Sequence, residues 1–422
     1  MNNEHKKLNV PNLRFKEFQG EWEKQKLCDI SSIIGRIGFR GYTTNDIVEK
    51  GMGAIALSPT NIVNNQLTYD KDNTYISMSK YEESPEIMIK RGDVIFVKTG
   101  STVGKVAYVD KMICKTTLNP QVVVLKDIKC DNYILSVIMS TRKFQNKIQR
   151  ITVGGAVPTL SQMAMGNIFI SLPAAKEQEK ISKFISLIDE RIVTQNKIIE
   201  DFKKLKAAIV EKVFCSPNQE YPMCRIEGFE QALSTYKMSD FSSRIATKNK
   251  DSKCSLVLTI AAQYGLVNQE SFFNKSVASE NLTGYYLLHK GEFAYNRSYS
   301  AGYDWGAVKR LDNYDEGVLS ALYICFKINE TIVDSDYLAY YFESSKWHKG
   351  LSDIAGEGAR NHGLLNVSMT DYFNTKHRFP VIEEQKAIAK MLNTIAEKER
   401  KATLLGECYQ KQKQYLLCQM FT

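Results

Sequence analysis

The feature that most constrains this chain is an internal repeat. The segment Pro11–Phe18 is echoed by Pro222–Phe229 at an offset of 211 residues, and the Glu-Gln pair at 177–178 returns at 384–385, at an offset of 207. The offsets between matches drift from 199 to 211, so insertions and deletions separate them. Two copies of about 205 residues are far longer than the repeats of a solenoid, so the pattern predicts a duplicated pair of domains.

Each copy divides into a first part of mixed character and a long helix. In the first part, short β-branched runs separated by Gly and Asn predict buried strands, and a helix is expected near 132–149 and again near 336–350. The strands are predicted at Asp93–Val97, Val106–Val109, Gln121–Leu125 and Leu322–Phe326. We therefore expect an α+β fold with globular domains at 1–172 and 217–379, and long helices at 173–216 and 380–422.

The long helices are predicted from forty residues without Pro or Gly between Ala174 and Phe214. Apolar side chains recur there at gaps of three and four, which is typical of a coiled-coil seam. The second copy has a weaker seam, interrupted by Lys398 and Gly406. The predicted packing residues are Ile181, Ile185, Ile188, Ile192, Ile199, Phe202, Leu205 and Ile209 in the first helix, and Ile388, Met391, Ile395, Leu405, Tyr409 and Leu416 in the second.

A single apolar stripe of about 60 Å needs a partner, and the other copy's helix is the obvious one. We expect the two helices to pack antiparallel, with a globular domain at each end, in a pseudo-twofold arrangement. The alternative is that each helix packs on its own globular domain as an ordinary surface helix.

The sequence contains no convincing catalytic or metal-binding motif. Gly100–Val106 resembles a phosphate-binding loop but has three residues between its glycines and Val106 at the place of the Ser/Thr, so we interpret it as a tight connection between strands. The five His form no metal-binding pattern. No apolar run is long enough to span a membrane, and no export signal is expected at the N-terminus. The nine scattered Cys favour reduced thiols in a cytoplasmic protein.

The positive charge of the chain lies in its first half. Residues 1–216 contain 32 Lys+Arg against 23 Asp+Glu, whereas residues 217–422 contain 24 against 24, so the net charge of +9 belongs to the first copy. Such a balance permits a polyanionic partner without requiring one.

Loops rich in Arg, Lys, Asn, Tyr and Gly occupy corresponding places in the two copies but differ in sequence. Arg can bind guanine and Asn adenine through paired hydrogen bonds, and backbone amides at Gly reach phosphates. A shared scaffold with divergent loops is what two different recognition surfaces would look like. The candidate DNA-binding residues are Arg36, Arg40, Lys98, Thr99, Ser101, Gly154 and Gly155 in the first copy, and Arg244, Lys248, Asn296, Arg297, Tyr299, Tyr303, Arg360 and His362 in the second.

Further motifs carry a resemblance to a known family. The opening Val10–Trp22, the segments Tyr295–Ser300 and Gly306–Leu311, and the Pro that precedes each Glu-Gln pair resemble the specificity (S) subunit of type I restriction-modification systems. The opening is most similar to staphylococcal and other Gram-positive members. The resemblance covers essentially the whole chain.

This resemblance implies a non-catalytic protein with two target-recognition domains, each a small curved sheet with flanking helices. Each domain would recognise one half of a split double-stranded DNA target, and the helices would set the spacer. Two modification subunits would dock on the helices, bring S-adenosylmethionine and methylate adenine at N6. Restriction subunits, with ATP and Mg²⁺, would add translocation and DNA cleavage. A free-standing sequence-specific DNA-binding protein and a coiled-coil scaffold without nucleic acid are the alternatives.

Overall fold

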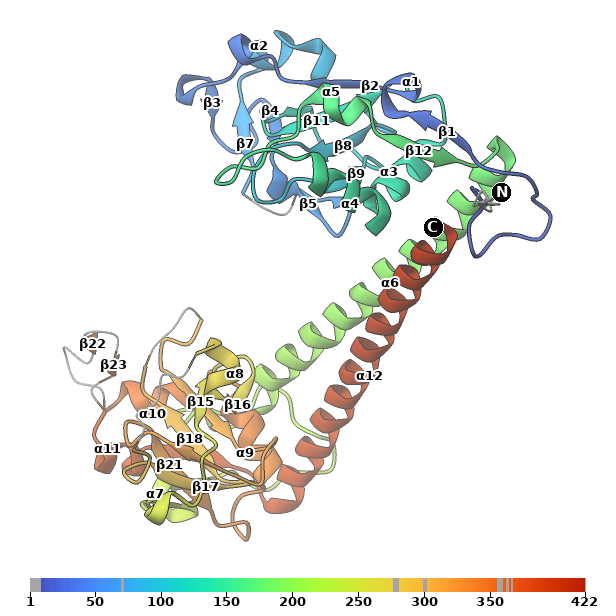
Figure 1. Cartoon of the computed structure of the whole chain (residues 1–422). Helices are drawn as coiled ribbons and strands as arrows, with labels where there is room; N and C mark the ends of the chain where they lie inside the picture. Colours follow the sequence, from blue (N-terminus) through green and yellow to red (C-terminus); the bar gives the residue numbers. More distant parts are fainter. Residues whose placement is uncertain are drawn as a thin grey trace. The chain divides into compact units, whose positions relative to one another are not determined.

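The two copies have a similar order of helices and strands along the chain. The computed structural model describes residues 9–69, 72–275, 281–298, 302–354, 360–361, 364–365 and 367–421. It divides into unit 1, Met1–Thr194 with Leu405–Thr422, and unit 2, Gln195–Leu404 (Figure 1). Each unit therefore contains one globular domain together with part of each long helix. All nine cysteines are free thiols, as expected.

Unit 1 is built on two sheets and a strand pair. A six-stranded sheet has the order β2-β11-β8-β9-β6-β5, a four-stranded sheet has the order β10-β4-β7-β3, and β1 pairs with β12. The strands are β1 Glu23–Lys26, β2 Ser32–Gly35, β3 Ile47–Val48, β4 Ala54–Leu57, β5 Ile62–Val63, β6 Gln66–Leu67, β7 Thr74–Ile76, β8 Val94–Val97, β9 Val106–Tyr108, β10 Thr116–Leu118, β11 Val122–Lys126 and β12 Phe169–Leu172. The short helices are α1 Leu27–Ile30, α2 Met78–Glu82, α3 Asn132–Ser140, α4 Arg142–Ile151 and α5 Gln162–Gly166.

Unit 2 repeats the centre of this plan. Its main sheet has the order β14-β21-β18-β19, which matches β2-β11-β8-β9, and β13 pairs with β24 as β1 does with β12. The strands are β13 Ser234–Lys237, β14 Ser242–Arg244, β15 Leu258–Ala261, β16 Gly265–Asn268, β17 Tyr286–His289, β18 Phe293–Asn296, β19 Ala307–Arg310, β20 Glu316–Leu319, β21 Ile324–Ile328, β22 Arg360–Asn361, β23 Leu364–Leu365 and β24 Lys376–Phe379. The short helices are α7 Met238–Phe241, α8 Gln269–Phe273, α9 Ser335–Tyr341, α10 His348–Ser352 and α11 Met369–Asn374.

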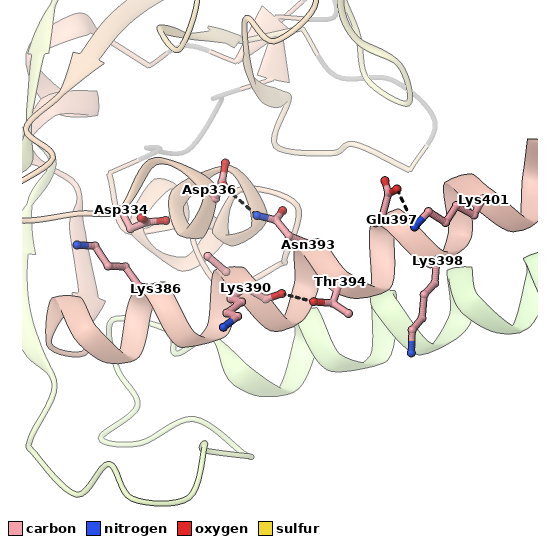
Figure 2. A pocket seen from close by; sticks show the side chains of 10 residues that line it. Asp334, Asp336, Lys386, Lys390, Asn393, Thr394, Glu397, Lys398 and Lys401 are labelled. Carbon is pink, nitrogen blue, oxygen red and sulfur yellow. Dashed lines mark hydrogen bonds and ion pairs between the residues drawn. The ribbon is translucent and has the colours of Figure 1, made fainter.

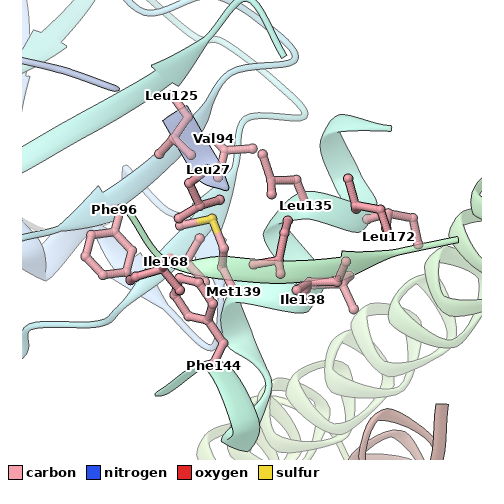
Figure 3. Close-up of a cluster of buried hydrophobic side chains, with 14 of the residues drawn as sticks. Leu27, Val94, Phe96, Leu125, Leu135, Ile138, Met139, Phe144, Ile168 and Leu172 are labelled. Carbon is pink, nitrogen blue, oxygen red and sulfur yellow. The ribbon is translucent and has the colours of Figure 1, made fainter. Parts of the chain in front are cut away.

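The apolar strands form because their side chains are buried on both faces. Each residue of β8 is buried, since Val94 and Phe96 face one hydrophobic cluster and Ile95 and Val97 face another. Figure 3 shows the first cluster, where Leu27 of α1 and Leu135 of α3 meet side chains of β8. The predicted strands are confirmed, with Leu322–Phe326 observed as β21, which begins at Ile324.

The predicted helix at 132–149 is corrected to two helices. α3 ends at Ser140 and α4 begins at Arg142, because Thr141 between them has an extended backbone with ψ of 149°. The Thr141 hydroxyl accepts a hydrogen bond from the Phe144 amide at 3.4 Å, which caps the N-terminus of α4. The predicted helix at 336–350 is likewise corrected to two helices, because six residues separate the end of α9 at Tyr341 from the start of α10 at His348.

Both long helices are confirmed. α6 spans Ala175–Val213 and α12 spans Ile382–Met420, each 39 residues, and Lys398 and Gly406 do not interrupt α12. In unit 1, the Lys413 ammonium lies 2.5 Å from the Asp189 carboxylate, and the Arg191 guanidinium lies 5.3 Å from the centroid of the Tyr409 ring. The partner number falls as the α6 number rises, so the two helices run antiparallel (Figure 1).

A buried glutamine joins the helices in unit 2. The Gln195 side-chain amide donates a 2.9 Å hydrogen bond to the Ala402 carbonyl oxygen across the helix pair. Further along, the Lys206 ammonium lies 3.3 Å from the Glu399 carboxylate, again in antiparallel order. A polar group inside an apolar seam favours the one register that satisfies it.

Most predicted packing residues lie in the seam. They are buried at Ile181, Ile185, Ile192 and Ile388, and half-buried at Ile188, Ile199, Phe202, Ile209, Met391, Ile395, Tyr409 and Leu416. Leu405 is a wrong prediction, because 43% of it is exposed, and Leu205 is also exposed. Ala402 and Gly406, four residues apart, occupy the buried face of α12, and Leu405 points about 100° away from Gly406.

Each long helix begins in the core of one copy and ends in the core of the other. Ile181 and Ile185, near the start of α6, pack in the first domain's core, whereas Phe214, directly after α6, packs against Tyr337 and Tyr341 of the second. Phe421, directly after α12, packs against Trp22 at a ring-centroid distance of 5.8 Å. These contacts exclude the alternative in which each helix folds only onto its own domain.

The repeated Glu-Gln pair anchors the start of each long helix. Arg14 binds the Glu177 carboxylate through two hydrogen bonds of 2.7 Å, and Arg225 binds Glu384 at 2.9 and 2.7 Å. The hydrogen bond to Glu177 raises the pKa of the Arg14 guanidinium. Gln178 accepts from the Asp131 amide at 2.8 Å and so holds the N-terminus of α3.

We expect Arg14→Met to reduce the free energy of unfolding of unit 1 by about 3–5 kcal/mol, because it leaves a buried carboxylate unpaired. The Glu177 side chain is 1% exposed. The exposed pair Arg91–Asp110 provides the control, since Arg91→Met should cost no more than about 1 kcal/mol. Urea unfolding measures both, and equal losses would contradict the assignment.

Candidate nucleic-acid interface

The candidate loops of unit 1 meet at one edge of the main sheet. Antiparallel pairing places the end of β8 beside the start of β9 and the start of β11, since Phe96 pairs with Val106 and Val97 with Val122. β2 ends at the same edge, where Gly35 pairs with Val123. The loops that contain Arg36, Lys98 and Gly154 therefore leave the domain together. The opposite edge leads to α3, whose start is held by Gln178 of α6.

Backbone hydrogen bonds join these loops. The Lys98 amide donates to the Gln121 carbonyl at 2.9 Å, and the Lys98 carbonyl accepts from the Leu160 amide at 2.8 Å. The Gly100 amide donates to the Pro158 carbonyl at 2.9 Å. Lys98 thus lies at the centre of a surface formed by the segments 98–105, 119–121 and 153–160, which we call the loop edge of unit 1.

The segment 119–121 belongs to the loop edge although the sequence reasoning did not select it. The Asn119 side-chain amide nitrogen donates to the Tyr42 hydroxyl at 3.2 Å, and its side-chain oxygen accepts from the Gln121 backbone amide at 2.7 Å. Asn119 and Gln121 are both half-buried at the surface. Asn119 lies two residues before the start of the predicted strand Gln121–Leu125, and Gln121 begins it, which is the signal that could have identified them.

The segment 153–159 is a small hairpin with an apolar surface. Val153 and Thr159 exchange two backbone hydrogen bonds, of 3.0 and 2.8 Å. Gly154 has φ of +105°, and a Cβ there would lie 2.7 Å from the Val157 carbonyl oxygen, so the turn requires glycine. Val153 is 75% exposed and Val157 is 60% exposed. Exposed apolar side chains of this kind can contact thymine methyl groups.

Unit 2 has an equivalent edge with different side chains. The Arg297 carbonyl accepts from the Leu365 amide at 3.0 Å, as Lys98 does from Leu160. The Arg297 guanidinium donates to the carbonyl oxygens of Val367 at 3.1 Å and Leu322 at 3.3 Å. Arg297 therefore occupies the position of Lys98, but its guanidinium also holds neighbouring loops in place.

Several predicted residues of unit 1 have side chains available for a ligand. Lys98 and Thr99 are half-buried, and Ser101, Gly154 and Gly155 are exposed. Within the described part of the chain, the side chains of Lys98, Thr99 and Ser101 have no hydrogen-bond partner.

Arg36 requires a correction as a DNA contact. It is 6% exposed, and its guanidinium donates to the Leu118 carbonyl at 2.8 Å and the Thr117 hydroxyl at 3.1 Å. Burial lowers the pKa of this guanidinium. Arg36 thus supports the loop from inside. Arg40 donates to the Glu83 carbonyl at 3.3 Å and lies 3.6 Å from the Glu86 carboxylate, so protein groups also engage it.

The predicted residues of unit 2 are only partly brought together. Arg244 donates to the Tyr286 hydroxyl at 2.9 Å, and the Lys248 ammonium lies 3.9 Å from the centroid of the same ring. Asn296 accepts from the Ser298 amide at 3.0 Å, and Tyr303 is half-buried. Tyr299 and His362 lie outside the described residues, and only the backbone of Arg360, in β22, is described.

Unit 2 also has a groove that the candidate loop residues do not line. Figure 2 shows this groove in unit 2, a cavity of about 560 Å³ between the start of α9 and one face of α12. Asn393 donates to the Asp336 carboxylate at 2.7 Å inside it, and four lysines surround it. Across the described residues, no cluster of His, Cys, Asp or Glu could hold a metal ion, and no helix has the length and apolar character of a membrane span.

Comparison with known proteins shows one family to which the chain is similar. Residues 19–204 match the family described as the type I restriction modification DNA specificity domain. The type I restriction enzyme MjaVIII specificity subunit of Methanocaldococcus jannaschii is 24% identical over 74% of this chain and 73% of its own length. The putative MjaX specificity subunit of the same organism is 22% identical over 93% of this chain and 90% of its own length.

Solved structures share the fold. The type I restriction-modification S subunit from M. genitalium aligns over 98% of this chain and 99% of that chain, with a TM-score of 0.53 and 14% identity. A chain from a study of assembly and conformational transition of the type I restriction-modification system aligns over 95% and 97%, with a TM-score of 0.51 and 15% identity.

The family match and the two relatives thus agree: residues 19–204 are similar to the specificity domain of type I restriction-modification systems, and both relatives are named as specificity subunits of such systems. The finer resemblance to staphylococcal members stays a prediction.

Substitutions of Arg36 and Lys98 should differ in their effect on the free energy of unfolding. We expect Arg36→Gln to reduce the free energy of unfolding by about 1–3 kcal/mol, because the Leu118 carbonyl and Thr117 hydroxyl lose a buried donor. Lys98→Gln should stay within about 0.5 kcal/mol of the parent, as for most surface changes. Urea unfolding distinguishes the two, and a destabilising Lys98→Gln would contradict this description of the loop edge.

Proposed function

We propose that this chain is the DNA specificity subunit of a type I restriction-modification complex, in which each unit recognises one half of a split target. The observation that supports this proposal is the loop edge. Each unit has its own four strands in an equivalent order, and loops leave both sets of strands at the equivalent edge. The loops of the two units differ in sequence. A constant scaffold with variable loops suits two readers of different sequences.

The side chains at the two edges are suited to DNA. In unit 1, Lys98, Asn119 and Gln121 can donate or accept hydrogen bonds at base edges, and Gly154 and Gly155 let backbone amides approach phosphates. In unit 2, Arg244 and Lys248 supply positive charge beside Tyr286. Phosphate contacts position the protein, whereas base contacts determine the sequence.

The paired helices set the spacer between the two half-sites. α6 and α12 are continuous and each contributes side chains to both cores, so we expect their length to set the spacer. One turn of DNA is about 34 Å. A helix of about 60 Å is a little under two turns of duplex long, which is the scale of two half-sites with a spacer between them.

The helices also dock two modification subunits, which bind S-adenosylmethionine and methylate adenine. The groove of unit 2 between α9 and α12, with its mixed lysines and carboxylates, is a suitable polar docking surface. Restriction subunits with ATP and Mg²⁺ complete the complex in the cytoplasm. This chain performs no chemistry itself. It determines the DNA sequence on which the other subunits act.

Substitutions at the two equivalent loop positions should affect different half-sites. We expect Lys98→Ala to relax or weaken recognition of the first half-site only, and Arg297→Ala that of the second only, by about 1–3 kcal/mol per lost base contact. Mapping methylated adenines in cells that contain each variant with the modification subunit measures this. A change in both half-sites from either single variant would contradict separate readers.

Lengthening the helices should change the spacer and not the half-sites. A four-residue insertion after Ile199, matched by four residues after Arg400, adds about one turn to each helix and keeps Gln195 opposite Ala402 and Lys206 opposite Glu399. Methylome mapping should then reveal the same two half-sites with a longer spacer. An unchanged spacer in an active complex would contradict the proposal that helix length sets the spacer.

The complex with modification subunits should also methylate its target far more selectively than this chain alone binds it. This difference distinguishes the proposed specificity subunit from a free-standing DNA-binding protein and from a scaffold without nucleic acid.

A further inference from the structure

A second basic surface of unit 1 lies on helix α4. Its outward side chains are Arg142, Lys143, Asn146, Gln149 and Arg150, and all five are exposed. Each of them can donate hydrogen bonds, and none is acidic. They follow one another over about two turns, or roughly 12 Å along the helix axis.

The surface exists because α4 is strongly amphipathic. Phe144 and Ile148, four residues apart, are buried in the main core of unit 1 and fix which face of the helix points inward. The basic side chains occupy the other face. Their outward direction is therefore determined by the core and not by contacts at the surface.

The surroundings of α4 contain an unusual excess of positive charge. No Asp or Glu occurs anywhere from Asn132 to Lys176, a run of 45 residues. Lys147 donates to the Phe169 carbonyl at 2.6 Å, and the Lys26 ammonium lies 5.6 Å from the centroid of the Phe169 ring. Burial and then the nearby charges of Lys143 and Lys24 lower the pKa of Lys147. Basic residues of β1 thus extend the patch beyond α4.

The basic face is continuous with the loop edge. α4 ends at Ile151, and the hairpin that begins at Val153 follows after one residue. The Gln145 side chain donates to the Gly104 carbonyl at 2.8 Å and ties α4 to the loop between β8 and β9. A ligand bound at the loop edge therefore has α4 as its neighbour.

The second copy lacks this surface. The equivalent helix α10 is only five residues long, and Lys349 is paired with Asp353 at 2.6 Å. Lys346, just before α10, lies 3.6 Å from the Glu211 carboxylate. Part of the excess positive charge of the first copy therefore lies on α4, whereas its counterpart in the second copy, α10, is nearly neutral.

We infer that α4 binds the phosphate backbone of DNA next to the first half-site, as a contact that positions unit 1 without selecting bases. This inference rests on the proposed function. Positively charged helix side chains in a stretch without Asp or Glu fit phosphate oxygens, which together with the sugars receive half or more of the hydrogen bonds between proteins and DNA. Unit 1 then holds its half-site more tightly through the backbone than unit 2 holds its own.

The test compares two variants that each remove two exposed positive charges from unit 1. Arg142→Gln with Arg150→Gln alters α4, and Arg91→Gln with Lys111→Gln alters the opposite edge of the main sheet. The complex with modification subunits is titrated with duplexes that contain or lack the methylated target, between about 50 and 200 mM salt. The α4 variant should weaken binding to both duplexes by a similar factor, ~3–10-fold, and lower the slope of log K against log salt by about 1.8.

The opposite-edge variant should retain the slope of the parent, and the methylated sequence should be unchanged in both variants. Equal slopes for the α4 variant and the parent would overturn the inference, as would weakening confined to the target duplex, which would indicate a base contact. A parent complex that does not distinguish the two duplexes would instead contradict the proposed function, while the slopes would still measure the role of α4.

Discussion

The fold depends on the exchange of helix ends between the two copies. Phe214 follows α6 and is buried among Tyr337 and Tyr341, and Phe421 follows α12 and is buried against Trp22. Neither core is complete without a residue from the other copy's long helix. This requirement explains why the helices cannot fold back onto their own domains. Once the helices are paired, the hydrogen bond from Gln195 to Ala402 favours one register between them.

Much of this arrangement could be predicted from the sequence. The repeat, the two long helices and the main strands follow from spacing and periodicity, which are local properties. The break at Thr141 could not be predicted, because an extended residue that caps one helix after another leaves the apolar pattern intact. The exposure of Leu405 was also missed, because the small residues Ala402 and Gly406 carry little hydrophobic signal although they line the buried face of α12.

The candidate site was predictable only in outline. The loop positions followed from the strands, since ends of antiparallel neighbours meet at one edge. The roles of individual side chains did not follow. Arg36 and Lys98 are both basic residues in predicted loops. The Arg36 guanidinium, however, donates hydrogen bonds to Leu118 and Thr117 inside the domain. Asn119 and Gln121 were passed over because their importance depends on hydrogen bonds to residues distant in sequence. A core shared by the two copies, with one strongly basic and one nearly neutral surface, is what we expect of two domains that diverged after duplication.

Zero-length carbodiimide coupling tests the antiparallel pairing most directly, because it joins only an amine and a carboxylate already in contact. The account predicts linked peptides that join Lys413 to Asp189 and Lys206 to Glu399 within one chain, with yields at least equal to the exposed same-helix pair Lys204–Glu200. Mass spectrometry of the digested monomer would detect them. Coupling of Lys204 to Glu200 with neither cross-helix link would contradict the account.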